Sequence, residues 1–381
     1  MLFLIRQALQ PVIAFFSAIL LMFSSSAPQK PAEEYDQVQN VIYLIGDGMG
    51  VYHLEKAKQE RNITLAMDTI EIEGRSQTRS ASSSVTDSAA GGTALSCGVR
   101  TMNGYVGVFY YDPLRVESTP KSITELCIEK GMKTGVVTTD NTSGATPSAF
   151  SVHTSSRNNT EDIDTQQMNS DIDLIWGCTS TYVDQATCEA NGFTFVKTYS
   201  EMMALEEGSR SFAQFDHNTW YTQQINDETP TLSQMAVKAI DLLDDTDEGF
   251  FIMIEGAHID KKSHDNNDAQ MTEALEEFDR TVAAALEYAE KDGNTLVVVT
   301  ADHETGGIVL NGDGTYSFTQ GSHSGADVPL LVYGSDNFIE NGETVKNVQI
   351  PERIAYSLGF AEGDFPCEVF VDWVGTIKEN F

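Results

Sequence analysis

The sequence has few basic residues for its length. Against 57 aspartates and glutamates it has only 23 lysines and arginines, which gives a formal net charge of −34 at pH 7. A charge of this sign repels nucleic acids and anionic membrane surfaces, so we expect no nucleic-acid recognition. The same charge opposes the capture of an anionic substrate, which would need locally bound cations to attract it.

Cysteine is also scarce, with five in 381 residues. Only Cys178 and Cys188 are close in sequence, within a polar segment, so these two could close a small disulfide loop. The odd number leaves at least one thiol free, and spacing does not determine the pairing. No pair of cysteines has the spacing typical of a zinc site.

Apolar runs long enough to cross a bilayer, about 20 residues, are absent, so we expect no stable membrane span. Near the N-terminus, Arg6 precedes an apolar run over Val12–Phe23 and then small polar residues. This pattern predicts a secretory signal peptide over residues 1–27, cleaved between Ser24 and Ala32, and a secreted or periplasmic protein. An uncleaved anchor is the alternative.

Internal repeats and low-complexity linkers are absent too, which favours one domain over residues 36–381. Short apolar runs rich in β-branched residues predict four buried strands, and helical patterns lie between them. This alternation predicts an α/β fold, a three-layer sandwich with a central, mostly parallel sheet flanked by helices. The four runs cover residues 41–45, 135–140, 250–255 and 296–303.

Other segments carry local predictions. An amphipathic helix is expected from Met271 to Ala289, stopped by Gly293, and another is expected to be capped by Thr229 with Pro230 in its first turn. Glycines between two short apolar runs predict a hairpin within residues 306–322. Residues 158–230 are polar and weakly patterned, and we expect them to form a surface insertion.

The predicted strands end in acidic residues, and the ends of parallel strands meet at one edge of a sheet. Asp47 follows the first strand, and Asp302 and His303 follow the last. Asp260 and His264 are four residues apart, so one helical turn would place them on the same face. Together with His323, from a later loop, these side chains form the mixture of nitrogen and oxygen ligands that zinc favours.

Ser88 lies where a polar turn gives way to small residues that could start a helix. The free N-terminus of a helix binds phosphate, and a nearby metal ion could lower the pKa of the hydroxyl. A plain helix cap is the alternative, since serine is among the commonest capping residues.

The segment Val85–Thr93, VTDSAAGGT, resembles the nucleophile motif of the alkaline phosphatases. Four further segments resemble other motifs of this family, in the same order. They are the loop Gly46–Gly50, the segment from Glu255 to His264, the segment from Thr300 to His303 and the loop around His323. The resemblance covers about residues 40 to 330. It implies a homodimeric phosphoric monoester hydrolase that releases inorganic phosphate through a phosphoserine on Ser88.

The resemblance also implies two zinc ions and one magnesium ion. The first zinc would be held by Asp260, His264 and His323, the second by Asp47, Ser88, Asp302 and His303, and magnesium by Asp47, Thr146 and Glu255. The last set contains only oxygen ligands, as a hard cation requires. Arg157 would hold two phosphate oxygens through its planar guanidinium, and Lys261 would reach the phosphate through water.

Two positions depart from the family pattern. Gly144 stands where the family usually has an aspartate or histidine that tunes the third metal ion, which puts the identity of that ion in doubt. Thr305 stands where many members have another histidine, so that support of the metal ligands is missing or replaced. The remaining histidines, His53, His153, His217 and His258, match no ligand position.

Three other functions compete with this one. A phosphodiesterase of the same superfamily would share both zinc sites, but Arg157 and the third metal site favour monoesters. A sulfatase would need a Cys/Ser-x-Pro-x-Arg segment, which does not occur. A non-catalytic phosphate-binding protein would not need Ser88 together with a complete set of zinc ligands.

Overall fold

The structure is a computed structural model that describes residues 31–111, 116–223 and 226–365. The signal peptide predicted over residues 1–27 and Cys367 lie outside the described residues. Within the described ranges, no helix combines the length and the apolar character needed to cross a membrane.

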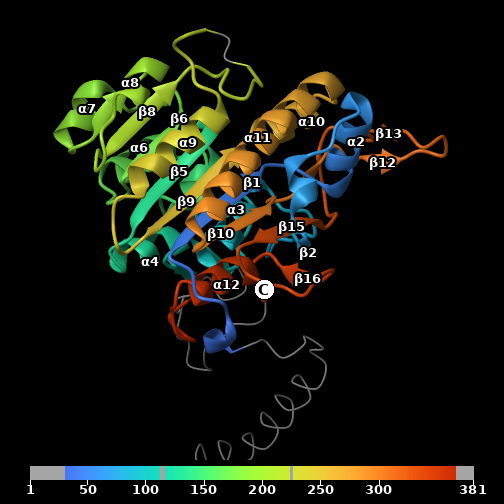
Figure 1. The fold of residues 1–381 in the computed structure, drawn as a ribbon, viewed down its shortest axis with the longest axis horizontal. Helices are drawn as coiled ribbons and strands as arrows, with labels where there is room; N and C mark the ends of the chain where they lie inside the picture. The colour runs from blue at the N-terminus through green and yellow to red at the C-terminus, as the bar shows by residue number, and fades with distance from the viewer. Residues whose placement is uncertain (1–30, 112–115, 224–225, 366–381) are drawn as a thin grey trace, which may run out of the picture.

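A ten-stranded sheet forms the centre of the fold, in the order β16-β2-β15-β10-β1-β9-β5-β6-β8-β7 (Figure 1). Every pairing from β10 to β7 is parallel, whereas β15 runs antiparallel to both of its neighbours. The strands are β1 (Asn40–Gly46), β2 (Ile72–Gln77), β5 (Lys133–Asn141), β6 (Leu174–Cys178), β7 (Thr194–Val196), β8 (Ser211–Phe215), β9 (Phe250–Gly256), β10 (Thr295–Thr300), β15 (Val328–Tyr333) and β16 (Thr344–Lys346).

Helices cover both faces of this sheet. Along β1, Ile42 and Leu44 join one hydrophobic core, and Val41, Tyr43 and Ile45 join the other. Residues of α9 and α11, which cross in front of the sheet in Figure 1, belong to the first core, and residues of α3, α4 and α12 belong to the second. The predicted three-layer α/β fold and its mostly parallel sheet are confirmed.

The α-helices are α2 (Val51–Arg61), α3 (Ser88–Cys97), α4 (Ile123–Glu129), α5 (Ala145–Ala149), α6 (Thr160–Met168), α7 (Gln185–Ala190), α8 (Tyr199–Met203), α9 (Leu232–Leu243), α10 (His258–His264), α11 (Asp268–Asp292) and α12 (Gln349–Ser357), and two 3-10 turns cover Ala32–Glu34 and Ala66–Thr69. Three small ribbons pair β3 (Phe109–Tyr111) with β4 (Val116–Ser118), β11 (Glu304–Thr305) with β14 (His323–Ser324), and β12 (Val309–Leu310) with β13 (Tyr316–Ser317).

One predicted helix end is confirmed and another is wrong. Gly293, at φ 74°, ends α11 in the left-handed conformation that glycine adopts at little cost. The cap of α9 is Thr231, not Thr229, and Pro230 precedes the cap. Gln234 lies three residues after Thr231, and the two exchange hydrogen bonds between side chain and backbone at 3.3 and 2.9 Å. Thr229 has no such partner in the helix, so the reciprocal capping box decided the boundary.

Part of the segment 158–230, which was expected to form a surface insertion, belongs to the central sheet. It supplies β6, β8 and β7, which complete one edge of the central sheet. Trp176 of β6 is fully buried, and its indole N–H donates to Ser211 of β8 at 3.0 Å. These strands have five residues or fewer, which is too short for a clear periodic pattern.

The disulfide considered between Cys178 and Cys188 does not form. Cys178 ends β6 and Cys188 lies in α7, and both are buried free thiols. The Cys178 sulfur contacts the Thr139 carbonyl oxygen at 3.4 Å, whereas the Cys188 sulfur lies 3.9 Å from the Met168 sulfur. The two side chains thus have different neighbours, because Cys178 lies at the end of a sheet strand and Cys188 lies within α7.

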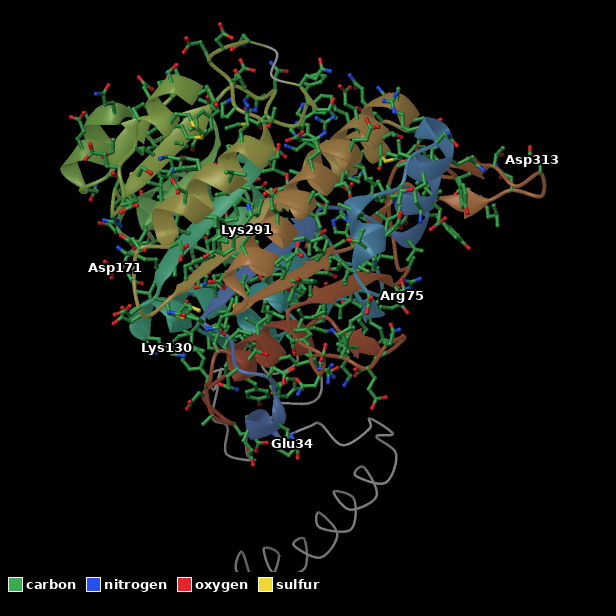
Figure 2. The ribbon with its side chains drawn as sticks, viewed as in Figure 1. Glu34, Arg75, Lys130, Asp171, Lys291 and Asp313 are labelled. Atoms are coloured by element: carbon green, nitrogen blue, oxygen red, sulfur yellow. The ribbon has the colours of Figure 1, made fainter. Side chains whose placement is uncertain are left out.

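The predicted hairpin is confirmed as the ribbon of β12 and β13, which pairs Val309 with Ser317 and Leu310 with Tyr316. Figure 2 shows Asp313 at its tip, projecting from the body of the protein.

Candidate metal centre and nucleophile

The acidic side chains of the candidate site meet at the carboxyl edge of the parallel strands. Ile45 of β1 lies beside Glu255 of β9 on one side and Thr300 of β10 on the other. Asp47 follows β1, which lies between β9 and β10, and Asp302 follows β10, so Asp47 emerges between Glu255 and Asp302. The chain therefore gathers several carboxylates at one edge, as the strand pattern predicted.

The first group consists of Asp260, His264 and His323, whose ligand atoms lie within 4.8 Å of one another. Asp260 and His264 are one turn apart on α10, and the His264 Nε2 atom lies 3.4 Å from a carboxylate oxygen of Asp260. His323, from β14, places its own Nε2 atom 3.1 Å from that of His264 and 3.6 Å from Asp260. Two imidazoles and one carboxylate thus face a common centre.

The second group consists of Asp47, Asp302 and His303, all buried. His303 places its Nε2 atom 3.4 Å from Asp47, 3.3 Å from Asp302 and 3.1 Å from the Ser88 hydroxyl. The two groups adjoin, because the rings of His303 and His323 stack at 3.6 Å between their centroids. The candidate nucleophile therefore lies beside the second group, within reach of the same imidazole.

Each of the three histidines is oriented through its other ring nitrogen. The Nδ1 atom contacts an oxygen in every case, so Nε2 is the atom directed at the centre. The contacts join His264 to the Gly321 carbonyl at 3.0 Å, His323 to the Thr86 carbonyl at 2.9 Å and His303 to the Thr305 hydroxyl at 3.2 Å.

The sequence left open whether the support of the metal ligands at position 305 is missing or replaced, and in the structure Thr305 itself contacts both groups. Its hydroxyl donates a hydrogen bond to Asp260 and also contacts His303, so it links the two groups. Gly48 must be a glycine here, because its φ is +73° and a Cβ atom would lie 2.8 Å from both Asp260 and Thr305. Its N–H donates to Asp302 at 3.2 Å.

Several buried oxygens of the site lack a hydrogen-bond partner. They are Oδ1 of Asp47, Oδ2 of Asp302 and the hydroxyl of Thr146. Burial raises the pKa of Asp47 well above its ordinary value, and repulsion from Asp302, Asp260 and Glu255 raises it further. Burial, followed by repulsion from Asp140, likewise raises the pKa of Glu255 to about 8. Bound cations would satisfy the lone pairs of these oxygens and offset the repulsion between the carboxylates, so the site is suited to metal ions.

Ser88 is the first residue of α3 and does not cap it. The cap is Asp87, which accepts a hydrogen bond from the Ala90 N–H at 3.0 Å and leaves the Ser88 hydroxyl turned toward His303. A Cβ atom on Gly91 would come within 3.0 Å of the Asp302 carbonyl, so this glycine lets the helix approach the second group. The alternative that Ser88 is a plain cap is therefore wrong.

Asp87 is a site residue that sequence analysis missed. Besides capping α3, it accepts hydrogen bonds from the Gly104 N–H at 3.0 and 3.1 Å and from Arg157 at 3.3 Å. Arg157 is therefore hydrogen-bonded to the residue that immediately precedes Ser88. The preference for aspartate at helix N-caps was the available signal.

Lys261 forms an ion pair with Asp140, near the end of β5, and its side chain is 39% exposed. Asp140 was not among the predicted site residues, although it ends one of the four predicted strands. Of the other histidines, His53 accepts from the Gly50 N–H at 3.1 Å, His153 pairs with Glu125 at 3.0 Å, and His258 stacks on Trp220 at 5.1 Å.

Comparisons with known proteins agree with this geometry. The model of the alkaline phosphatase family matches residues 38–185 and 179–352. Alkaline phosphatase 4 of Bacillus subtilis is 31% identical over 299 residues, which cover 73% of this chain and 64% of that protein. The chain thus matches slightly less than two thirds of this relative's length.

Two further proteins extend the likeness. The alkaline phosphatase of Escherichia coli is 31% identical over 348 residues, covering 73% of this chain and 71% of that protein. The solved structure of the alkaline phosphatase from the Antarctic bacterium TAB5 has a TM-score of 0.72 at 30% identity and covers 86% of this chain and 100% of that one. The chain therefore belongs to the alkaline phosphatase family, whose members are metal-dependent phosphomonoester hydrolases.

Proposed function

We propose that this chain hydrolyses phosphate monoesters through a phosphoserine formed on Ser88 and releases inorganic phosphate. The observation that carries the proposal is the Ser88 hydroxyl, which lies at the N-terminus of α3 and 3.1 Å from His303. A helix N-terminus favours an anion, and the adjoining groups provide ligands for cations.

The residues present fit two zinc ions and one magnesium ion. One zinc would be held by Asp260, His264 and His323, and the other by Asp47, Asp302, His303 and the Ser88 oxygen. Both sets mix imidazole and carboxylate ligands. Asp47, Thr146 and Glu255 would hold magnesium, because they offer only oxygens. The unpartnered oxygens of Asp47, Asp302 and Thr146 support this assignment.

When bound, the metal ions would stabilise negative charge on the attacking and leaving oxygens of the reaction. The side chains have separate tasks. Asp87 caps α3, so that the Ser88 hydroxyl faces the substrate rather than the helix backbone. The Ser88 oxygen attacks phosphorus and displaces the alcohol, and water then attacks the phosphoserine from the opposite side and releases phosphate.

Arg157 and Lys261 would bind the phosphate. Within the described residues, Arg157 uses only Nη1 in a hydrogen bond, to Asp87, so the rest of its planar fork can take two phosphate oxygens. Lys261, next to Asp260 in α10, would act through a bridging water. These two cations offset the unfavourable effect of the −34 net charge on an anionic substrate.

The test is hydrolysis of an aromatic phosphate monoester at alkaline pH with zinc and magnesium, using wild type, Ser88→Ala and Ser96→Ala. Ser96 is a buried serine of the same helix, away from the metal ligands, and is the matched control. We expect Ser88→Ala to lose at least about a thousandfold in kcat, as for other serine nucleophiles, and Ser96→Ala to retain activity. A phosphorylated Ser88 peptide should be recovered after acid quenching.

Monoester turnover that survives Ser88→Ala would refute the serine mechanism. The matching diester is assayed in parallel, because turnover of the diester alone would move the chain to the phosphodiesterase alternative, which the named relatives do not favour. Absence of turnover with every metal would leave a phosphate-binding protein.

We also propose that the protein is secreted or periplasmic and forms a homodimer. The N-terminal apolar run supports export, and N-terminal sequencing of the exported protein would identify the cleavage site. The homodimer is implied by the family resemblance, and sedimentation at two protein concentrations would test it.

A further inference from the structure

Near the proposed magnesium ligands, the Asp140 side chain fills space that a side chain at position 144 would need. Gly144 precedes Thr146 by two residues, and a Cβ atom on Gly144 would lie 2.6 Å from Oδ2 and 3.0 Å from Cγ of Asp140. The backbone at Gly144, φ −58° and ψ 157°, is one that any residue adopts. Space rather than conformation therefore favours glycine here, because the Asp140 carboxylate fills that space together with the Asn141 carbonyl oxygen, which would lie 3.0 Å from the Cβ atom.

Asp140 is held in this place from several sides. Its N–H donates to the Thr138 hydroxyl at 2.8 Å, and its Oδ1 accepts the Asn141 N–H at 2.8 Å and pairs with Lys261. The same Thr138 hydroxyl donates to Glu255, its register partner on β9. Asp140 and Glu255 are thus joined through one hydroxyl, and the orientation of Asp140 is defined.

Lys261 interacts electrostatically with the carboxylates of both Asp140 and Glu255. The charges of Asp140 and Glu255 both act on its ammonium, and the hydrogen-bonded ion pair is with Asp140. Glu255 is fully buried and hydrogen-bonds to Thr138. Without Asp140, Glu255 would be the strongest remaining attraction for Lys261, and an ammonium paired with Glu255 would compete with a metal ion for the same oxygens.

We propose that Asp140 is a positioning residue for the third metal ion, and that it supplies from position 140 the side chain that position 144 lacks. It holds Lys261 away from Glu255 and adds negative charge beside the site. The inference rests on the proposed function, because it takes Asp47, Thr146 and Glu255 as the magnesium ligands. It also indicates that an all-oxygen site suited to magnesium persists despite Gly144.

The experiment measures magnesium binding, not turnover. Magnesium chloride is titrated calorimetrically into zinc-loaded full-length protein, as wild type, Asp140→Asn and Asp171→Asn. Asp171 precedes β6, so this exposed residue lies at the amino edge of the parallel strands, opposite Asp140, and its variant changes the net charge equally. We expect Asp140→Asn to weaken binding by roughly tenfold to a hundredfold, as for loss of one charge near a partly buried ion, and Asp171→Asn to match wild type.

Two double variants test how Asp140 acts. In Asp140→Ala/Gly144→Asp the side chain that excludes a Cβ at position 144 is removed and a carboxylate is supplied from that position, so magnesium affinity should recover to within a few fold of wild type, whereas Asp140→Ala alone should remain weakened. In Asp140→Asn/Lys261→Ala the competing ammonium is gone, and the loss should be smaller than in Asp140→Asn. Recovery in both would support the proposal, and it would exclude a mere folding defect of the single variant.

Magnesium affinity of Asp140→Asn within threefold of wild type would overturn the inference, as would equal losses in Asp140→Asn and Asp171→Asn. The outcome of this experiment is independent of whether the proposed function is correct. A protein that binds magnesium in this pattern but hydrolyses no monoester would retain the inference and refute the activity.

Discussion

The metal-free protein should lose stability as the pH rises, and Glu255 should account for much of the loss. Its folded pKa is raised from 4.5 to about 8, mainly by burial and then by Asp140. Between these values the folded state keeps a proton that the unfolded chain has released. The unfolded state then binds fewer protons, so the free energy of unfolding falls as pH increases from about 4.5 to 8.

The magnitude follows from about 1.4 kcal/mol for each pH unit over which the proton is retained. For Glu255, with its pKa raised from 4.5 to about 8, this amounts to about 5 kcal/mol. In a protein of this size the loss corresponds to roughly 5–10 °C in Tm. Bound cations should abolish most of it, because they favour the ionised carboxylates.

Calorimetric melting of chelator-treated protein at pH 5 and pH 8 provides the assay. Glu255→Gln cannot ionise, and Gln can still accept the hydrogen bond from Thr138, so its Tm should fall less with pH than that of wild type. Some decrease should remain, because the pKa of Asp47 is raised for the same reasons. Glu290→Gln, at an exposed position of α11, is the control. Equal pH dependence in wild type and Glu255→Gln would refute the reasoning.

Three further results are expected. Thr305→Val should weaken zinc binding about ten- to hundredfold in a chelator competition, because two ligands lose their shared hydroxyl, and Thr305→Ser should not. Asp87→Ala should lower the free energy of unfolding by about 1 kcal/mol and raise KM through Arg157, whereas Asp87→Asn should keep the cap and change KM alone. Mass spectrometry of unreduced, denatured protein alkylated at its thiols should find Cys178 and Cys188 both modified; a linked peptide pair would contradict the structure.

Much of the candidate site could be predicted because its residues stand next to regular elements. Asp47 and Asp302 follow apolar runs that form β1 and β10, and parallel neighbours bring such ends together. Asp260 and His264 share a face because of their spacing in α10. The roles assigned to Thr146, Arg157 and Lys261 came from family resemblance rather than from pattern, and they remain predictions.

Other features could not be predicted because they depend on contacts between distant segments. The short strands β6, β7 and β8 gain stability from pairing in the sheet, which a weakly patterned sequence does not reveal. The predicted cap of α9 was wrong by two residues because two threonines, Thr229 and Thr231, lie near its start, and only Thr231 meets a partner three residues later.

The sequence by itself determined the layers of the fold and the edge at which the site forms, since both follow from the period of apolar residues and from where strands end. Tertiary structure alone decided how the site is supported. Thr305 reaches Asp260, Asp87 reaches Arg157, and Asp140 fills the space beside Gly144. These relations depend on distances of a few ångströms between side chains that no local pattern specifies, because packing brings them together only after the sheet has formed.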